Sequence, residues 1–547
     1  MTKLFKQPVA SWKEAFLTYT HPRVVTLFFL GFSAGLPLLL IFGTLSFWLA
    51  RAGVDISTIT YFSWAALGYS FKFVWAPLID RLPFPVLHRL LGRRRSWLLV
   101  TQIMIAFAIA WMGLTQPMPG KLEIMAYAAV LLGFSAASQD IVIDAYRIEI
   151  AKKEYQAAMS AMYQAGYRIG MLVAGAGAFY LVSWFSQGAV VLKELVLFSS
   201  YGISHLLIGA GEQSVYLYPA WRWAYLLLAA CMSVGILTTL LMPEPVKKAE
   251  VEKINQEIFH STLDYVRFLF LFLITTGAFV SAFVYLNPAD TIVQVLHAKF
   301  GVNGVLSKFT GQAIRLLISL TLAIGTAYLL VLIKAVDKVM VVDTYIKPVV
   351  DFTSRYKKTF IIVLLLIGFY RISDIVLGVV ALIFYEKMGF SEVQIADISK
   401  TFGLMMIIVG GFLGGLLTAR FGVLRILLIG AILAAATNIL FMIFAQVGSD
   451  TTMFIIVIAA DNLSAGLAGA AFIAYLSSLT NMSFTAMQYA LFTSIMTLIP
   501  KLIAGYSGSI VENIGYEYFF LFTTILGIPV VLLIIYLIMY EQKHKTD

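Results

Sequence analysis

Apolar runs long enough to cross a bilayer dominate this sequence. A transmembrane helix needs about 20 predominantly apolar residues. Fourteen runs meet that length, at 24–50, 57–79, 97–116, 122–146, 157–184, 221–242, 264–287, 312–333, 359–384, 393–418, 423–446, 452–479, 486–510 and 517–540. Only 12% of the residues are charged, about half the share of a soluble protein. The chain is therefore predicted to be an all-α integral membrane protein.

Lys and Arg are unevenly distributed between alternate loops. If the N-terminus is cytoplasmic, the cytoplasmic loops hold roughly three times as many basic residues as the loops on the other side. This bias predicts that both termini are cytoplasmic. It assigns the net charge of +10 to helix orientation rather than to nucleic-acid binding. It also requires residues 186–220 not to cross the membrane, so we expect a periplasmic or membrane-surface insertion there.

Two polar segments, 243–262 and 334–358, divide the chain. Two additional predicted helices lie between them, and six predicted spans lie on each side. We therefore expect an N-terminal six-helix bundle over 1–242, linker segments with two extra helices over 243–358, and a C-terminal six-helix bundle over 359–547. The two halves share a faint internal likeness, which is typical of secondary transporters that bind their cargo where the halves meet.

Eight charged residues lie well inside the apolar runs. A charge at the centre of a bilayer costs ~2.5–3.5 kcal/mol on insertion scales, so such residues persist where they pair or line a water-filled cavity. Pairing alone cannot neutralise this set, which has more cations than anions: Lys72, Arg168, Arg371, Lys400, Lys501, Asp140, Asp374 and Asp461. The excess of cations predicts a polar pathway with a preference for anionic cargo.

Six polar residues at depth are candidates for contact with cargo: Lys72, Arg168, Arg371, Asp461, Asn462 and Lys501. Arg371 could hold a carboxylate, while Asp461 beside Asn462 places an acceptor next to an amide, which suits sugar hydroxyls. Lys501 follows Pro500, which kinks the helix and frees backbone groups. Aromatic residues flank Lys72; they could pack on a sugar ring, although core packing is the simpler role.

Acidic residues on the fourth predicted span are candidates for proton coupling. Asp140, Asp144 and Arg147 are spaced at i, i+4 and i+7, so they share one helix face. A carboxylate in the wall of a cavity can take up a proton in one state and release it in another. Asp140 and Asp144 fit that role. For Arg147 and Glu149 the sequence favours a solvated helix end.

Four more residues are candidates for coupling or gating. Asp374 lies one turn after Arg371, so it either neutralises that cation or orients a cargo that Arg371 holds. Lys400 lies early in its helix and could also reach the membrane surface. Asp80 and Arg81 close one helix, and the basic sequence GRRRSW opens the next. We expect them to latch the two halves through ion pairs and helix ends.

Some chemistry is disfavoured by the sequence. GFSAG at 31–35 matches the G-x-S-x-G nucleophile elbow, but it lies inside a predicted transmembrane helix instead of between a strand and a helix. The spacing of Gly31 and Gly35 suits close packing of two helices. The single cysteine, Cys231, excludes a disulfide framework, and the histidines form no metal-ligand cluster. We expect neither an enzyme nor a metal site.

Several segments together resemble one family. They are LFFLGFSAGLPLLLIFGTL, YSFKFVWAPLIDR, GRRRSWLL, SAASQDIVIDAYRIE, YRIGMLVAG, FYRISD, SKTFGL and DNLSAGLAGAAF. These segments resemble the AmpG-type muropeptide permeases of Gram-negative bacteria, which are members of the major facilitator superfamily. The likeness covers most of residues 22–242 and 359–540. The two additional helices and the insertion at 186–220 depart from the family pattern.

The resemblance implies a major facilitator fold of two six-helix bundles, here with two extra helices between them. It also implies proton-coupled import of GlcNAc-1,6-anhydroMurNAc and its peptides across the bacterial inner membrane by alternating access. Such import serves peptidoglycan recycling and, where an inducible β-lactamase exists, its induction and antibiotic resistance. The proton gradient replaces any cofactor, and we expect a monomer. Transport of another anionic solute, such as a small peptide or an acyl-CoA, is the alternative.

Overall fold

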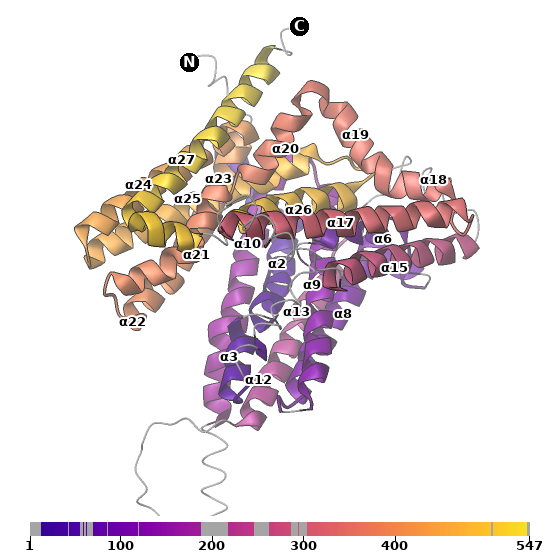
Figure 1. Cartoon of the computed structure of the whole chain (residues 1–547), viewed down its shortest axis with the longest axis horizontal. Helices are drawn as coiled ribbons and strands as arrows, with labels where there is room; N and C mark the ends of the chain where they lie inside the picture. Colours follow the sequence, from indigo (N-terminus) through magenta and orange to yellow (C-terminus); the bar gives the residue numbers. More distant parts are fainter. Residues whose placement is uncertain are drawn as a thin grey trace, which may run out of the picture. The chain divides into compact units, whose positions relative to one another are not determined.

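The computed structural model describes residues 12–41, 43–54, 58–59, 62, 69, 71–84, 86–118, 120–186, 217–245, 262–285, 294, 304–504 and 507–543. These residues form helices joined by turns and contain no strand (Figure 1). Among them, twelve helical segments are long and apolar enough to cross a membrane. The predicted all-α membrane class is confirmed. The count of fourteen spans stays a prediction, and most of the expected insertion at 186–220 lies outside the described residues.

The chain divides into two compact units. We call Trp12–Phe71 with Phe84–Pro245 the N-terminal unit, and Lys72–Pro83 with Val246–Asp547 the C-terminal unit. The short segment Lys72–Pro83 therefore packs with later residues, although its position in the sequence falls inside the predicted bundle 1–242.

Long helices with one buried side build the N-terminal unit. They are α2 (Pro22–Ile41), α3 (Gly43–Arg51), α8 (Arg93–Leu114), α9 (Leu122–Ile150), α10 (Gln156–Leu172), α12 (Tyr218–Cys231) and α13 (Ser233–Leu241). The shorter α1 (Trp12–Leu17) and α7 (Leu87–Leu91) join them, and a π-helical turn, η6 (Val173–Gly177), extends α10. Aromatic side chains form much of the core: Trp48 stacks on Trp221 with ring centroids 5.4 Å apart. Burial of such large apolar surfaces holds these helices together.

Helices α2 and α10 touch backbone to backbone through glycines. A Cβ added at Gly35 would lie 2.0 Å from the backbone oxygen of Tyr167, and one at Gly166 would lie 1.9 Å from that of Phe28. Gly31 is similarly close to α10, since its added Cβ would lie 2.2 Å from a backbone oxygen there. No real Cβ fits at such distances, so the close helix packing expected from the GFSAG sequence is confirmed.

The C-terminal unit contains η4 (Lys72–Val74), α6 (Ala76–Arg81), α15 (Thr262–Tyr285), α17 (Gly304–Leu332), α18 (Lys338–Val341), η7 (Val342–Ile346), α19 (Lys347–Tyr356), α20 (Phe360–Phe369), α21 (Ile372–Lys387), α22 (Glu392–Ile395), η9 (Ala396–Phe402), α23 (Gly403–Phe421), α24 (Val423–Val447), α25 (Thr451–Leu479), α26 (Thr485–Ala504) and α27 (Ser507–Lys543). The two additional helices predicted between the halves are α15 and α17, which pack on each other. An aromatic cluster around Phe384 and Phe444 forms the core of α21, α24, α25 and α27.

Two predicted spans are interrupted. In the described part of 57–79, a 3₁₀ turn at Lys72–Val74 and a turn at Trp75 precede α6. Pro77, at the start of α6, has no N–H to continue the preceding turn. The span 359–384 breaks at Arg371, whose φ of −102° and ψ of 10° are not helical. Discontinuous helices are common in transporters, where they place backbone groups and charges at polar sites.

Candidate functional site

Arg147 is the buried centre of a polar cluster at the end of α9. Its Nη2 lies 3.3 Å from Asp144 Oδ1, and its Nη1 donates to Ser160 Oγ at 3.1 Å and to Gln156 Oε1 at 3.4 Å. The amide of Gln156 donates in return to the Arg147 carbonyl oxygen at 2.9 Å. The Arg147 side chain is fully buried. A buried charge must find partners within the protein; here Asp144 of α9 and the N-terminal part of α10 supply them.

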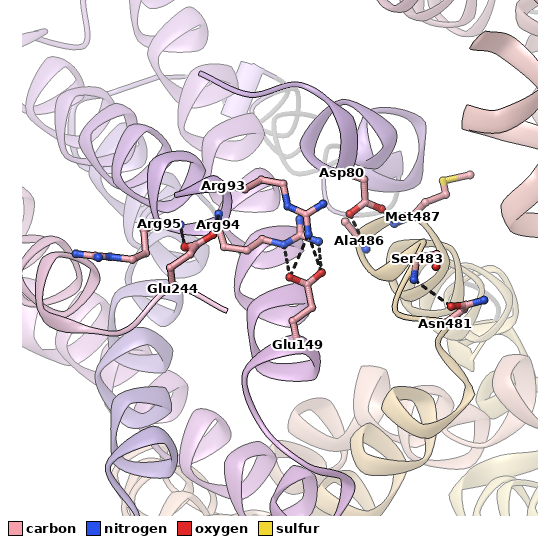
Figure 2. Close-up of polar contacts among 10 residues, drawn as sticks. All are labelled: Asp80, Arg93, Arg94, Arg95, Glu149, Glu244, Asn481, Ser483, Ala486 and Met487. Atoms are coloured by element: carbon pink, nitrogen blue, oxygen red, sulfur yellow. Dashed lines mark hydrogen bonds and ion pairs between the residues drawn. The ribbon is translucent and has the colours of Figure 1, made fainter. Parts of the chain in front are cut away.

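Glu149 joins the end of α9 to the start of α8 (Figure 2). Its carboxylate accepts from Arg93 Nη2 at 3.1 Å and from Arg94 Nε at 3.0 Å, and its side chain is 9% exposed. Sequence reasoning placed Arg147 and Glu149 at a solvated helix end. That interpretation is wrong, because both charges are neutralised inside the protein, Arg147 by Asp144 of its own helix and Glu149 by two arginines of α8.

Glu244 caps the N-terminus of α8. It accepts from the backbone N–H of Arg94 at 2.8 Å and of Arg95 at 3.1 Å (Figure 2). A carboxylate here satisfies two free N–H groups and complements the positive end of the helix dipole. Arg95 Nε also donates to the Thr239 carbonyl oxygen at 2.9 Å. The sequence analysis missed Glu244, and only charge complementarity with the distant GRRR cluster could have indicated it.

Asp140 lies one helical turn before Asp144 on α9 and is partly exposed. The Tyr163 hydroxyl of α10 donates to Asp140 Oδ1 at 3.2 Å, and the Tyr163 ring centroid lies 6.0 Å from that of Tyr167. Arg168, the next residue of α10, is also partly exposed. The structure therefore joins the predicted coupling carboxylate to the helix that carries a predicted cargo-binding cation.

Gln139 lies beside Asp140 in the chain and was not singled out in the sequence. It is fully buried, and neither its Oε1 nor its Nε2 has a hydrogen-bond partner among the described residues. An unsatisfied buried amide costs about 1–3 kcal/mol per polar group. Gln139 is therefore a candidate for hydrogen bonding with hydroxyl or amide groups of a cargo in a conformation that exposes it. Its position inside an apolar run was the feature of the sequence that could have identified Gln139 as a candidate.

Arg371, Asp374 and Asp461 form the polar group of the C-terminal unit. Arg371 lies at the break between α20 and α21, Asp374 lies in the first turn of α21, and all three side chains are partly exposed. Asp374 lies close enough to Asp461 on α25 for the two carboxylates to interact electrostatically. In the described structure, no ion pair within 4.0 Å joins Arg371 to Asp374. Arg371 therefore keeps its hydrogen-bonding capacity toward an anion.

Asp461 and Asn462 have hydrogen bonds within the C-terminal unit. Thr437 Oγ1 donates to Asp461 Oδ1 at 3.5 Å, and Asn462 Nδ2 donates to the Ile458 carbonyl oxygen at 3.0 Å. One amide hydrogen of Asn462 is thus used by its own helix. The proposed contact with sugar hydroxyls depends on the remaining polar capacity of the two side chains.

The three predicted lysines occupy different surroundings. Lys72 is buried at the start of the 3₁₀ turn η4 in the C-terminal unit. Lys400 is exposed in the π-helical turn η9, which precedes α23. Lys501 follows Pro500 inside α26 as predicted, and its side chain lies outside the described residues. Their roles stay predictions.

Asp80 caps the N-terminus of α26 (Figure 2). Its two carboxylate oxygens accept from the backbone N–H of Ala486 at 3.2 Å and of Met487 at 2.9 Å, and the side chain is buried. The Arg81 guanidinium lies 5.5 Å from the ring centroid of Phe484, just before that helix. Asp80 thus contacts a helix end, as expected for a residue that latches helices together. Its gating role stays a prediction.

We expect Asp80→Ala to destabilise the protein by about 1–2 kcal/mol, because it removes a charged cap from two free N–H groups in a buried place. Asp80→Asn should cost less, since its amide oxygen still accepts one hydrogen bond. Thermal unfolding of purified protein followed by circular dichroism measures this. The control is Asp450→Ala, which removes an exposed cap on α25 with an Oδ1 to Met453 N distance of 2.7 Å. Equal losses from Asp80→Ala and Asp450→Ala would contradict the importance of burial.

The described helices, with apolar outer faces and polar groups at depth, define a multi-pass helical membrane protein of the kind to which secondary transporters belong. A model of the Major Facilitator Superfamily matches residues 25–371 and 359–547. The chain therefore belongs to the major facilitator superfamily.

Comparison with known proteins places this chain near the family that the motifs resemble. It is 28% identical over 516 residues to "Putative transporter AmpG 4" of Rickettsia conorii, covering 94% of this chain and 96% of that protein. It is 28% identical over 519 residues to the "Anhydromuropeptide permease" of Escherichia coli K12, covering 94% and 80%. The resemblance predicted from the sequence motifs is thereby confirmed.

Solved structures support the fold. The major facilitator proton:xylose symporter XylE, bound to 6-bromo-6-deoxy-D-glucose, matches with a TM-score of 0.52 and 11% sequence identity over 95% of both chains. A likeness at such low identity concerns the fold alone. It confirms the predicted major facilitator fold.

Proposed function

We propose that this chain imports anhydromuropeptides, meaning GlcNAc-1,6-anhydroMurNAc and its peptides, by alternating access driven by a proton gradient. The observation that carries the proposal is the similarity along 94% of the chain to a protein named anhydromuropeptide permease. The excess of Lys and Arg in alternate loops supports an inner-membrane protein with cytoplasmic termini. Import would then supply peptidoglycan recycling and the signal that induces β-lactamase.

The polar residues at depth suit this cargo. Anhydromuropeptides carry peptide carboxylates, and the partly exposed guanidinium groups of Arg168 and Arg371 are able to bind carboxylates in a bidentate manner. The sugars carry hydroxyl and amide groups, for which the buried amide of Gln139 and the carboxylate of Asp461 provide donors and acceptors. This combination fits a cargo that is both anionic and rich in hydroxyls.

The carboxylates Asp140, Asp374 and Asp461 are the candidates to carry the proton. A transmembrane potential supplies ~2.3 kcal/mol per charge per 100 mV. The inward movement of one proton with each cargo molecule would therefore contribute free energy to the accumulation of the cargo. Asp140 Oδ1 accepts from the Tyr163 hydroxyl at 3.2 Å, and Asp144 Oδ1 lies 3.3 Å from the buried guanidinium of Arg147. A carboxylate beside a cation keeps its charge, so Asp144 is the weaker candidate for reversible protonation.

Uptake by proteoliposomes tests the proposed function. Purified protein should accumulate labelled GlcNAc-anhydroMurNAc tripeptide when a pH gradient is imposed, and should only equilibrate it without the gradient. Unlabelled anhydromuropeptide should compete, whereas a free small peptide or an acyl-CoA should not. Saturable uptake of one of those competitors without uptake of the muropeptide would favour the alternative cargo and overturn the proposal.

A further inference from the structure

Residues 334–358, which we call the connecting segment, lie between the membrane-spanning helix α17 and the apolar helix α20. In Figure 1, α18 and α19 follow one another between the ends of these two helices. The chain turns sharply at both ends, where Lys334 and Lys357 have φ of 56° and 38°. Because it joins the ends of two apolar helices, this segment lies at a membrane surface.

One face of the connecting segment is fixed to the C-terminal unit. The ring of Phe352 is buried, with its centroid 4.9 Å from that of Phe492 on α26. Gln488 Nε2 donates to the Pro348 carbonyl oxygen at 2.8 Å, and Arg355 Nη1 donates to the carbonyl oxygen of Leu479 at 2.9 Å. These contacts determine which side of α19 faces outward.

The acidic residues of the segment are all engaged within the protein. Asp343 is buried and lies 2.6 Å from Lys347 Nζ. Asp351 accepts from Arg355 Nε at 2.9 Å, and also from the side chains of Gln488 and Asn481. Asp337 caps α18 by accepting from the backbone N–H of residue 339 at 3.0 Å. Asp343 and Asp351 are thus neutralised by basic partners, and Asp337 is the one carboxylate of the segment that stays exposed with its charge unpaired by a cation within 4.0 Å in the described structure.

The basic residues have the opposite arrangement. Four lysines are exposed and have no carboxylate within 4.0 Å in the described part of the chain: Lys334, Lys338, Lys357 and Lys358. Large apolar side chains are exposed beside them, at 40–54% of their surface: Val339, Ile346, Val349 and Val350. A helix that exposes both lysines and apolar side chains is typical of one that lies in the interface of an anionic membrane.

We propose that the outward face of the connecting segment binds the headgroups of anionic phospholipids in the leaflet where it lies. Charge complementarity and position both favour this occupant: the free ammonium groups match lipid phosphates, and the adjoining apolar side chains match the acyl boundary. Lys347 and Arg355 contribute less, because their charges are already paired. The inference does not rest on the identity of the cargo.

Local lipid enrichment tests this binding surface. The full-length protein, with Cys231→Ser and a fluorophore attached at Ser354→Cys, is reconstituted into phosphatidylcholine vesicles. Quenching by headgroup-labelled phosphatidylglycerol is compared with quenching by phosphatidylcholine that carries the same label. We expect stronger quenching by phosphatidylglycerol, and we expect added salt to weaken the preference because screening reduces the attraction.

Three substitutions, Lys338→Gln, Lys357→Gln and Lys358→Gln, should together reduce the preference at least tenfold, since each basic residue near an anionic leaflet contributes up to about fivefold. The matched control, Arg51→Gln with Lys121→Gln and Lys387→Gln, removes as many exposed cations from the ends of other helices and should leave the preference unchanged. Replacing the three segment lysines by arginine should also preserve it and shows that the site tolerates substitution.

Equal quenching of the unsubstituted protein by both lipids overturns the proposal. A preference that survives the three glutamine substitutions, or one that the control substitutions remove equally, also overturns it, because the binding would then not belong to this surface. Muropeptide uptake by the same vesicles is measured separately. Loss of the lipid preference with uptake intact, or the reverse, distinguishes failure of this inference from failure of the proposed transport function.

Discussion

Replacing Asp140 by asparagine is expected to abolish proton-driven accumulation of muropeptide while leaving binding intact. Asparagine has nearly the same shape, and its carbonyl oxygen still accepts from the Tyr163 hydroxyl, which lies 3.2 Å from Asp140 Oδ1. It cannot take up or release a proton. Uptake into proteoliposomes with an imposed pH gradient should therefore fall to the level reached without a gradient, while exchange of labelled for unlabelled cargo continues.

Two variants make the Asp140 experiment decisive. Asp397→Asn changes an exposed aspartate of η9 and should accumulate cargo normally. Tyr163→Phe removes the hydrogen bond but retains the carboxylate, so it should slow transport without uncoupling it. Normal accumulation by Asp140→Asn would exclude Asp140 from coupling and would leave Asp374 and Asp461 as the carboxylates to test.

Replacing Arg147 by methionine is expected to destabilise the protein by about 3 kcal/mol or more. Removing one partner of a buried ion pair costs about 3–5 kcal/mol, because the other charge is left uncompensated. Here Asp144 would lose its cation at 3.3 Å while its side chain is only 13% exposed. Ser160 and Gln156 would each lose a donor as well. Thermal unfolding can be followed by a thiol-reactive dye on Cys231, which belongs to the same unit.

A second Asp–Arg pair provides the control. Asp264 and Arg267 have the same spacing on α15, but they lie 3.7 Å apart and the Arg267 side chain is 44% exposed. The Asp264 side chain is 17% exposed, but the more exposed guanidinium and the longer distance make this pair weaker, so Arg267→Met should cost less than Arg147→Met. The double variant Arg147→Met with Asp144→Asn should recover part of the loss, because no unpaired charge remains. Equal effects at Arg147 and Arg267 would contradict the buried network.

The all-α membrane class could be predicted from the sequence because it depends on one property, the length of the apolar runs. An apolar run long enough to cross a bilayer has to form a helix, since its backbone groups find no other partner in lipid. The same reasoning located the two additional helices α15 and α17. It did not predict the break at Arg371, because no proline or glycine marks that position and the interruption depends on tertiary surroundings.

The candidate site was less predictable. Helical spacing correctly suggested that Asp144 and Arg147 share one face, but it did not show that α10 would bury the guanidinium. The wrong assignment of Glu149 has a similar cause, since its partners Arg93 and Arg94 lie 55 or more residues earlier in the chain. Contacts with such distant partners depend on which helices pack against each other, and helix packing cannot be read from a single sequence.

The glycine contacts between α2 and α10 limit how these two helices can move relative to each other. Where two backbones touch, neither helix can slide along or tilt against the other without a collision. A pair of spin labels, one on each of these helices, should therefore report the same separation in every state of a working cycle. That separation gives an internal ruler against which distance changes elsewhere in the molecule can be calibrated.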